Sequence, residues 1–305
     1  MNMFSYILLG CCIVLALMVI ALVIRLKKVK KTAQGNVSEK DIALIVAEEK
    51  LLLDNIEQGL KNREFKMYLQ FSVDSKTKKL VSAEALSRWE KSDGEILFPG
   101  QYIGIMEKFG FITSLDYYMF EMACRKLAEW QGTEFDDIAI SCNFTRITIS
   151  EKDFISMIRE ISDRYPFDRY KLQIEITEDS IEKNLDIAMK NILWAKELGF
   201  TIALDDIGSG YTSLKNLCEY PIDIVKIDRA ILLLANEEKG KKLFRGIISL
   251  AHSLNLQAVC EGVETEEQNT LVSESDCDFI QGWYYSKALP EDKAEEFAME
   301  YISKL

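Results

Sequence analysis

Short apolar stretches rich in β-branched residues alternate with longer stretches of helical periodicity from residue 66 onward. The short stretches predict eight strands, at 66–74, 80–89, 137–143, 171–176, 200–205, 222–227, 256–261 and 277–281. Between most of them, apolar residues recur every three or four positions and predict helices at 114–130, 150–163, 183–198, 236–253 and 291–303. Alternating strands and helices indicate a parallel sheet, and eight strands in about 240 residues have the size of a (β/α)8 barrel.

The first two predicted strands depart from this regular pattern. Only residues 75–79 separate them, which is too few for a helix, so these two strands should run antiparallel. We therefore predict an α/β fold, a TIM (β/α)8 barrel modified by one antiparallel strand. An open, doubly wound sheet is the alternative, but no Gly-x-Gly-x-x-Gly motif follows the first strand.

The N-terminal segment has a different pattern. Phe4 to Ile24 is an apolar run of 21 residues without a charge, and about 20 such residues span a bilayer as a helix. A cleaved signal peptide is the rival interpretation, but the preceding basic residue, the shorter core and the small-residue cleavage site that it requires are not clear here. Basic residues at 25–31 follow the run, which predicts that the N-terminus lies outside and the body of the protein in the cytoplasm.

Residues 32–37 have the composition of a short linker, and residues 38–63 have the pattern of an amphipathic helix. Two interpretations of this helix stay open: it mediates dimerisation beside the membrane, or it packs on the body of the protein. The predicted organisation is a transmembrane signal-anchor helix with a basic flank at 1–31, a linker and juxtamembrane helix at 32–64, and a barrel at 65–305.

The charge of the chain excludes some ligands. Its net charge is −12, and residues 1–31 hold five basic residues and no acidic ones, so the remainder is more acidic still. Such a body disfavours nonspecific binding of long nucleic acid, because that affinity depends on neutralising phosphates. A small phosphate ligand held through metal ions is compatible with this charge.

Histidine and cysteine usage excludes several kinds of site. The chain has one histidine, His252, which excludes a histidine-rich metal site and a nuclease site built on paired histidines. His252 lies in a helical pattern, where a structural role is favoured. The seven cysteines contain no Cys-x-x-Cys pair and fit free thiols in a reducing cytoplasm.

Polar side chains recur where the predicted strands end, and in a TIM barrel catalytic groups lie at the carboxyl ends of strands. These ends carry, in order, Glu84, Asn143, Glu175 with Glu178, Asp205 with Asp206, Lys226 with Asp228, Glu261 with Glu264, and Gln281. Oxygen ligands without histidine or thiolate favour Mg²⁺ or Mn²⁺. Two such ions about 4 Å apart stabilise the attacking and leaving oxygens of phosphodiester hydrolysis. Lys226 adds a positive charge for a phosphate oxygen or a water.

Each of these residues also has a structural interpretation. A lone Asp205–Asp206 pair at a strand end is more often a solvated strand end or a helix cap than a metal site. Glu84 and Glu175 are flanked by apolar residues and are costly to bury unless they are paired, so a structural salt bridge would explain either one. The recurrence of such groups at consecutive strand ends makes the structural interpretation weak for the set.

At these positions the chain resembles the EAL-domain cyclic di-GMP phosphodiesterases, over residues 50–300. The shared motifs are Glu84-Ala85-Leu86 with Arg88 and Trp89, Asn143, Glu175-Ile176-Thr177-Glu178, Asp205 to Tyr211, Lys226-Ile227-Asp228, Glu261 to Thr265 with Gln268, and Gln281-Gly282. The resemblance implies a barrel with one antiparallel strand, two Mg²⁺ or Mn²⁺ ions, and hydrolysis of cyclic di-GMP to linear 5′-pGpG. It also implies a homodimer through the barrel and, with the N-terminal run, a single-pass protein of a bacterial cell membrane whose catalytic domain is cytoplasmic and whose anchor contacts the lipid bilayer.

The resemblance assigns roles to individual residues. The first ion is assigned to Glu84, Asn143, Glu175 and Asp205, and the second ion with its bridging water to Asp205, Asp206 and Glu261. Lys226 positions the nucleophilic water, and Gln281 orders the water network or the ligand. Arg88 contacts a substrate phosphate, with Leu86 and Asp228 as further substrate-binding residues. Glu178 and Glu264 support the loop that follows Asp206.

The departures from the family pattern are Ile207 for a usual Phe, Ser209 for Thr, Thr212 for Ser and Cys260 for Ala, and none of them removes a ligand. We expect Ile207 to alter the packing of the loop and hence the rate. Two alternatives stay open. A catalytically silent receptor would bind cyclic di-GMP without hydrolysing it, and a phosphodiesterase for another cyclic dinucleotide would differ in its preferred substrate.

Overall fold

The computed structural model describes residues 53, 55–177, 185–208 and 214–305. The chain divides into two compact units, Met1–Asn55 and Ile56–Leu305. The first unit lies almost entirely outside the described residues, and so do the predicted segments at 1–31 and 32–37 and most of the helix at 38–63. Residues 55–61 are helical and precede the first strand. The domain boundaries drawn from the sequence stay predictions.

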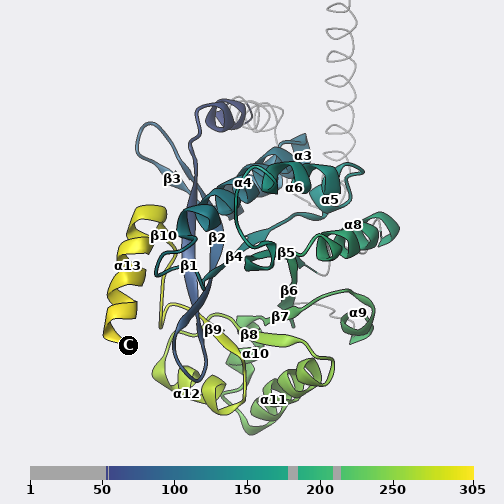
Figure 1. Cartoon of the computed structure of the whole chain (residues 1–305). Helices are drawn as coiled ribbons and strands as arrows, with labels where there is room; N and C mark the ends of the chain where they lie inside the picture. The colour runs from purple at the N-terminus through teal and green to yellow at the C-terminus, as the bar shows by residue number, and fades with distance from the viewer. Residues whose placement is uncertain (1–52, 54, 178–184, 209–213) are drawn as a thin grey trace, which may run out of the picture. The chain divides into compact units, whose positions relative to one another are not determined.

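Eight of the described strands form a closed barrel (Figure 1). They are β1 (Phe65–Asp74), β2 (Leu80–Glu90), β4 (Ala139–Asn143), β5 (Leu172–Thr177), β6 (Thr201–Ile207), β7 (Ile224–Ile227), β8 (Gln257–Cys260) and β9 (Phe279–Gln281). Their order is β1-β9-β8-β7-β6-β5-β4-β2, and pairing of β1 with β2 closes the ring. The short strands β3 (Ile96–Leu97) and β10 (Leu289–Pro290) extend β2 and β1 outside it. All eight predicted strands are confirmed, and the closed ring excludes the open sheet.

Strand β1 runs antiparallel to both of its barrel neighbours, β2 and β9, whereas the other neighbouring pairs in the ring are parallel. The turn between β1 and β2 is tight because one carboxylate oxygen of Asp74 accepts the backbone N–H groups of Lys76 and Thr77, at 3.0 and 2.6 Å. Lys78 completes the turn in the left-handed region at φ 62°. The predicted antiparallel strand is therefore confirmed.

The helices lie around the barrel (Figure 1). They are α3 (Pro99–Phe109), α4 (Ile112–Trp130), α5 (Arg146–Ile149), α6 (Phe154–Ser162), α8 (Leu185–Glu197), α9 (Leu214–Glu219), α10 (Arg229–Leu234), α11 (Glu238–Ser253), α12 (Glu266–Glu274) and α13 (Glu291–Lys304), with a 3₁₀ turn at Arg169–Lys171. The five predicted helices correspond to α4, α6, α8, α11 and α13 and are confirmed.

The described helices α3, α5, α9, α10 and α12 were not among those predicted, and α3 and α12 are the longest of these. Helix α3 begins at a proline and contains two glycines, and its position comes from burial of Tyr102 and Met106. Helix α12 is mostly polar, and its start is fixed by a capping box in which Thr265 and Gln268 satisfy each other's backbone N–H groups. The Thr-x-x-Gln spacing was the available signal for α12.

The core lies between the barrel and the helices. Along β5 the side chains alternate, so that Ile174 and Ile176 are buried on the helix side while Glu175 faces the barrel interior. Phe120 of α4 is fully buried and its ring lies 5.5 Å from that of Phe144 and 5.8 Å from that of Phe200. Packing of this kind holds the strand ends in register, because each buried large side chain contributes about 1.5–3 kcal/mol.

In the part of the chain that the structure describes, no helix has the length and apolar character needed to cross a membrane. The longest described helix, α4, has 19 residues and carries charged groups such as Glu121, Arg125 and Glu129. This finding contradicts the predicted localisation as a single-pass protein of a bacterial cell membrane, and that prediction is withdrawn. The apolar run at 4–24, on which the prediction rested, lies outside the described residues.

Replacing Phe120 tests the packing between α4 and the barrel. Phe120→Ala should lower the free energy of unfolding by about 3–5 kcal/mol, because it leaves a cavity in the aromatic cluster. Met299→Ala, at a side chain that is 46% exposed, should change it by about 0.5 kcal/mol or less. Urea unfolding followed by circular dichroism measures both, and equal effects of the two variants would contradict this account of the core.

Candidate functional site

Lys226 is the centre of a buried cluster at the carboxyl ends of the barrel strands. Its side chain comes from β7 and is only 3% exposed as a residue. The Lys226 Nζ atom lies 2.7 Å from Glu261, 3.0 Å from Glu175, 3.4 Å from Glu84 and 3.6 Å from Asp205. Each of these four carboxylates belongs to a different strand end, so the barrel brings together residues up to 177 positions apart in the sequence.

The charges in this cluster do not balance. Burial alone would lower the pKa of Lys226, but the surrounding carboxylates outweigh it and hold that pKa well above its usual value. Burial raises the pKa of Glu175 well above its usual value, and repulsion from Glu84 and Asp205 adds to the shift. One ammonium thus faces four carboxylates, and the remaining negative charge favours a bound proton or a bound cation.

Two side-chain amides donate to Glu84 in addition to Lys226. Asn143 donates to Glu84 Oε1 at 2.8 Å and Gln281 donates to Glu84 Oε2 at 2.7 Å. Burial alone would raise the pKa of Glu84, but Lys226 and these two amides lower it below its usual value. Ser72 of β1 in turn donates to Gln281 Oε1 at 3.1 Å, so the antiparallel strand helps to orient the amide.

A second group of carboxylates lies beside the first. Asp205, Asp206 and Glu261 each offer an oxygen, and these oxygens lie within 4.8 Å of one another, close enough to share a metal ion. Burial raises the pKa of Glu261 to about 7 against the effect of Lys226, with a contribution from Asp205. Burial also raises the pKa of Asp206, and Asp205 and Asp228 add to it. A divalent cation with oxygen ligands fits this donor set.

The backbone at Asp206 is strained. Its φ is 63°, and its N–H donates to Asp205 Oδ1 at 2.8 Å. Aspartate tolerates this left-handed conformation better than most side chains do. Gly208 follows at φ 98°, where a Cβ would lie 2.3 Å from the side chain of Ile231. The Asp-Asp-Ile-Gly sequence therefore makes a turn that brings both carboxylates to the mouth of the barrel.

The structure also locates the remaining predicted residues. Asp228 caps α10 by accepting the N–H of Ala230 at 2.8 Å. Glu264 forms a two-pronged ion pair with Arg229, at 2.6 and 2.7 Å. Ile207 is buried. Glu178, Ser209 and Thr212 lie outside the described residues.

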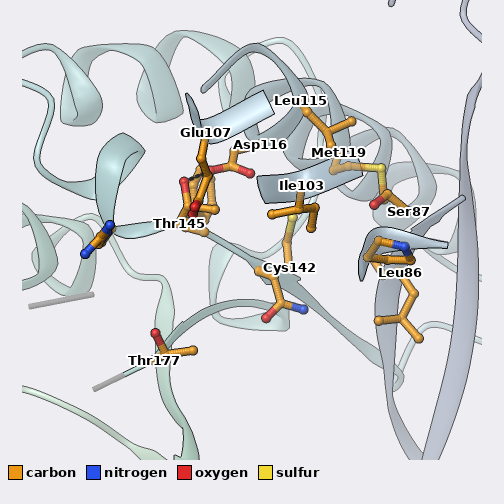
Figure 2. Close-up of a pocket in the computed structure, with 15 residues that line it drawn as sticks. Leu86, Ser87, Ile103, Glu107, Leu115, Asp116, Met119, Cys142, Thr145 and Thr177 are labelled. Carbon is orange, nitrogen blue, oxygen red and sulfur yellow. Dashed lines mark hydrogen bonds between the residues drawn. The ribbon is translucent and has the colours of Figure 1, made fainter. Parts of the chain in front are cut away.

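Two cavities open at the mouth of the barrel, and Leu86 lines both. One, of about 320 Å³, is lined by Glu84, Asp205, Glu261, Gln281, Arg229 and Trp283, among others. The other, of about 480 Å³, lies beside Asn143 and towards α3 and α4. Figure 2 shows Glu107, Asp116 and Thr145 gathered on one side of it and Leu86, Ile103 and Met119 on the other.

A family model described as the EAL domain matches residues 53–288. The chain belongs to the EAL domain family.

Several known proteins are similar to this EAL chain. The signaling protein YkoW of Bacillus subtilis is 30% identical over 250 residues, which are 82% of this chain and 31% of YkoW. The cyclic di-GMP phosphodiesterase NbdA of Pseudomonas aeruginosa is 27% identical over 263 residues, which are 86% of this chain and 34% of NbdA. The chain thus spans about a third of the length of these relatives.

Solved structures share the fold. The structure titled "PaMucR Phosphodiesterase, c-di-GMP complex" is 28% identical with a TM-score of 0.75, and the match covers 80% of this chain and 99% of that one. An EAL domain protein from Listeria monocytogenes EGD-e is 29% identical with a TM-score of 0.71, covering 79% of this chain and 95% of that one.

The larger cavity was not predicted from the sequence. Its buried acid, Asp116, accepts hydrogen bonds from the backbone N–H and hydroxyl of Thr145 and from the hydroxyl of Thr148, at 3.0, 2.7 and 2.6 Å. An acid on the apolar face of a helical pattern was the available signal for Asp116. Nothing in the spacing indicated the two threonines.

Metal binding at the carboxylate cluster is testable without substrate. Mn²⁺ in excess should raise the melting temperature of the protein by about 5 °C or more, since a ligand at 100 times its Kd adds about 2.7 kcal/mol of stability. Asp206→Asn should remove most of this rise. Asp276→Asn is a matched control, because Asp276 also has a positive φ, of 56°, and is exposed. The same rise in both variants would contradict a site at Asp206.

Asp116 makes a prediction about pH. Burial raises the pKa of Asp116 from 3.8 to about 6, against the hydrogen bonds from Thr148 and Thr145. The folded state therefore holds the Asp116 proton more tightly than the unfolded state does. The contribution of this proton to the free energy of unfolding should be complete below about pH 4 and should be lost as the pH rises through about 6.

The Asp116→Asn variant should lack this fall in the free energy of unfolding, which amounts to up to about 3 kcal/mol between pH 4 and 6. Urea unfolding at several pH values measures it. Stability curves of the native protein and Asp116→Asn that run parallel between pH 4 and 6 would contradict the assignment.

Proposed function

We propose that this protein is a metal-dependent phosphodiesterase that hydrolyses cyclic di-GMP to linear 5′-pGpG. The observation that carries the proposal is the convergence of four carboxylates from four strand ends on Lys226, with Asp206 beside them. The relatives support it, since two of them are named as phosphodiesterases and one solved relative is a complex with cyclic di-GMP.

Two divalent ions, Mg²⁺ or Mn²⁺, are proposed as the cofactors. Glu84, Asn143, Glu175 and Asp205 would hold the first ion, and Asp205, Asp206 and Glu261 the second. The donor set fits hard cations, because it consists of carboxylates and an amide oxygen. When bound, such ions lower the pKa of a water and neutralise charge on a phosphoryl group.

The surplus of negative charge around Lys226 supports the two metal ions of this proposal. Glu175 is 2% exposed, and the Nζ atom of Lys226 lies 3.0 Å from its carboxylate oxygen. A cation between Glu84, Glu175 and Asp205 would offset both the burial of Glu175 and its repulsion by Glu84 and Asp205, which together raise the pKa of Glu175. Lys226 would then be released from some of these carboxylates to orient the attacking water.

Glu261 is the carboxylate closest to Lys226, at 2.7 Å from Nζ. Burial raises the pKa of Glu261 to about 7, and a divalent cation beside it would lower that pKa and favour the ionised ligand. We assign Glu261 to holding the second ion, with Lys226 positioning the water and Gln281 orienting Glu84.

The two cavities suit a cyclic dinucleotide, in which two bases flank a ring of two phosphates. The smaller cavity contains the carboxylates, and the larger one combines the apolar side chains Ile103 and Met119 with the acids Glu107 and Asp116. We propose that a phosphate lies over the carboxylates and a guanine enters the larger cavity, past Leu86. Arg88 would bind a phosphate, and Asp228 would face the substrate from the end of β7.

Glu264 is proposed to support the loop after Asp206 through its ion pair with Arg229, and Glu178 keeps the same proposed role. Arg229 also packs on Gly262, where a Cβ would lie 2.7 Å from its side chain. The homodimer through the barrel stays a prediction.

Glu84→Ala tests the proposal directly. The variant should lose turnover of cyclic di-GMP by about 100-fold or more, a loss equal to about 2.7 kcal/mol of transition-state stabilisation. Chromatographic measurement of pGpG in the presence of Mg²⁺ or Mn²⁺ gives the rate, and Ca²⁺ should inhibit by displacing the smaller ion. Glu95→Gln, at an exposed residue paired with Lys91, is the control and should keep full activity.

The wild-type protein decides between the alternatives. Binding of cyclic di-GMP without formation of pGpG would contradict hydrolysis and indicate a receptor. Faster turnover of another cyclic dinucleotide would contradict the substrate.

A further inference from the structure

Arg88 stands at the mouth of the barrel, near the carboxyl end of β2. It follows Glu84 and Leu86 on the same face of β2, since side chains of a strand alternate. Among the described residues, no carboxylate forms an ion pair with its guanidinium. Its one hydrogen bond in this part of the chain is from Nη1 to the carbonyl oxygen of Ser87, at 2.8 Å. The positive charge is therefore available to an anionic ligand.

Two aromatic rings hold this guanidinium instead. The Arg88 Cζ atom lies 5.5 Å from the ring centroid of Tyr68 and 5.0 Å from that of Phe98. Both distances are within the range of cation–π attraction.

Strand register places both rings beside Arg88. Tyr68 of β1 is opposite Leu86 and therefore diagonal to Arg88, a separation that aromatic and long side chains bridge. On the other side, Trp89 is opposite Leu97 of β3, so the next residue, Phe98, continues the ladder beside Arg88. The short strand β3 thus brings a ring to Arg88 from outside the barrel.

Both rings are themselves held in place. The hydroxyl of Tyr68 donates to Glu90 at 2.9 Å. The N–H of Phe98 donates to the side chain of Gln101 at 2.8 Å, and Pro99 begins α3 directly after it. Phe98 nevertheless remains 57% exposed. An exposed ring on a fixed backbone contributes little to the core, which makes a role at the site the better explanation.

We propose that Tyr68 and Phe98 are positioning residues that hold the Arg88 guanidinium ready for a substrate phosphate. The inference rests on the proposed function. A free arginine side chain loses rotamer freedom when it binds, and a guanidinium already held between two rings loses less. The rings act on binding through Arg88 and have no part in the chemistry at the carboxylates.

Phe98→Ala is the test in the full-length protein. It should raise KM for cyclic di-GMP about threefold to tenfold, the size of one cation–π contact at a partly exposed site, and leave kcat unchanged. The Kd of cyclic di-GMP measured with Ca²⁺ should rise by the same factor. Tyr170→Ala is a matched control, since Tyr170 is 63% exposed and has Lys171 over its ring at 5.9 Å, at the start of β5 and far from the mouth. It should change neither constant.

Further variants separate positioning from a structural role. Phe98→Tyr keeps the ring and should restore wild-type KM, whereas Phe98→Leu keeps the apolar character and should not. In an Arg88→Ala background, Phe98→Ala should have no further effect on Kd, because the group that it positions is absent.

Three results would overturn the inference. If the wild type turns over or binds cyclic di-GMP and Phe98→Ala leaves both KM and Kd unchanged, Phe98 has no positioning role. An equal loss in the Arg88→Ala background would show that Phe98 acts on the fold. If the wild type neither binds nor hydrolyses cyclic di-GMP, the proposed function fails and this role fails with it.

Discussion

The ammonium of Lys226 among four carboxylates is the interaction on which the mouth of the barrel depends. Glu84, Glu175, Asp205 and Glu261 each lie within 4 Å of it. Burying so many like charges is tolerable only with a cation or protons among them, because unpaired charges are expensive inside a protein. The site is therefore built around a shortage of positive charge, and this shortage is what makes divalent cations suitable occupants.

The closing strand connects this electrostatic problem to the fold. Because β1 runs antiparallel between β2 and β9, Gln70 lies opposite Glu84 and Ser72 lies opposite Gln281. Ser72 orients the amide of Gln281, and that amide donates to Glu84. The antiparallel strand thus helps to fix the Glu84 carboxylate. A regular parallel strand at this place would present a different register to Glu84.

The mouth divides into a charged side and a more apolar side. The carboxylates occupy one cavity, while Ile103, Met119 and Asp116 line the other, with Leu86 between them. The larger cavity and the ring pair at Arg88 both depend on the segment that leaves β2, turns through β3 and begins α3. The proposed substrate recognition and the proposed metal binding therefore use different parts of the barrel mouth.

Local pattern was enough to predict the eight strands, five of the helices and the antiparallel pair, because alternation, helical periodicity and a five-residue connection are properties of neighbouring residues. It also indicated Glu84, Glu175 and Asp205, because acids at apolar strand ends are costly without a partner. The spacing could not indicate that Lys226 would contact four carboxylates at once, that Asp116 would contact Thr145, or that Phe98 would reach Arg88. Those contacts join residues distant in the sequence, and only the closure and register of the barrel bring them within bonding distance.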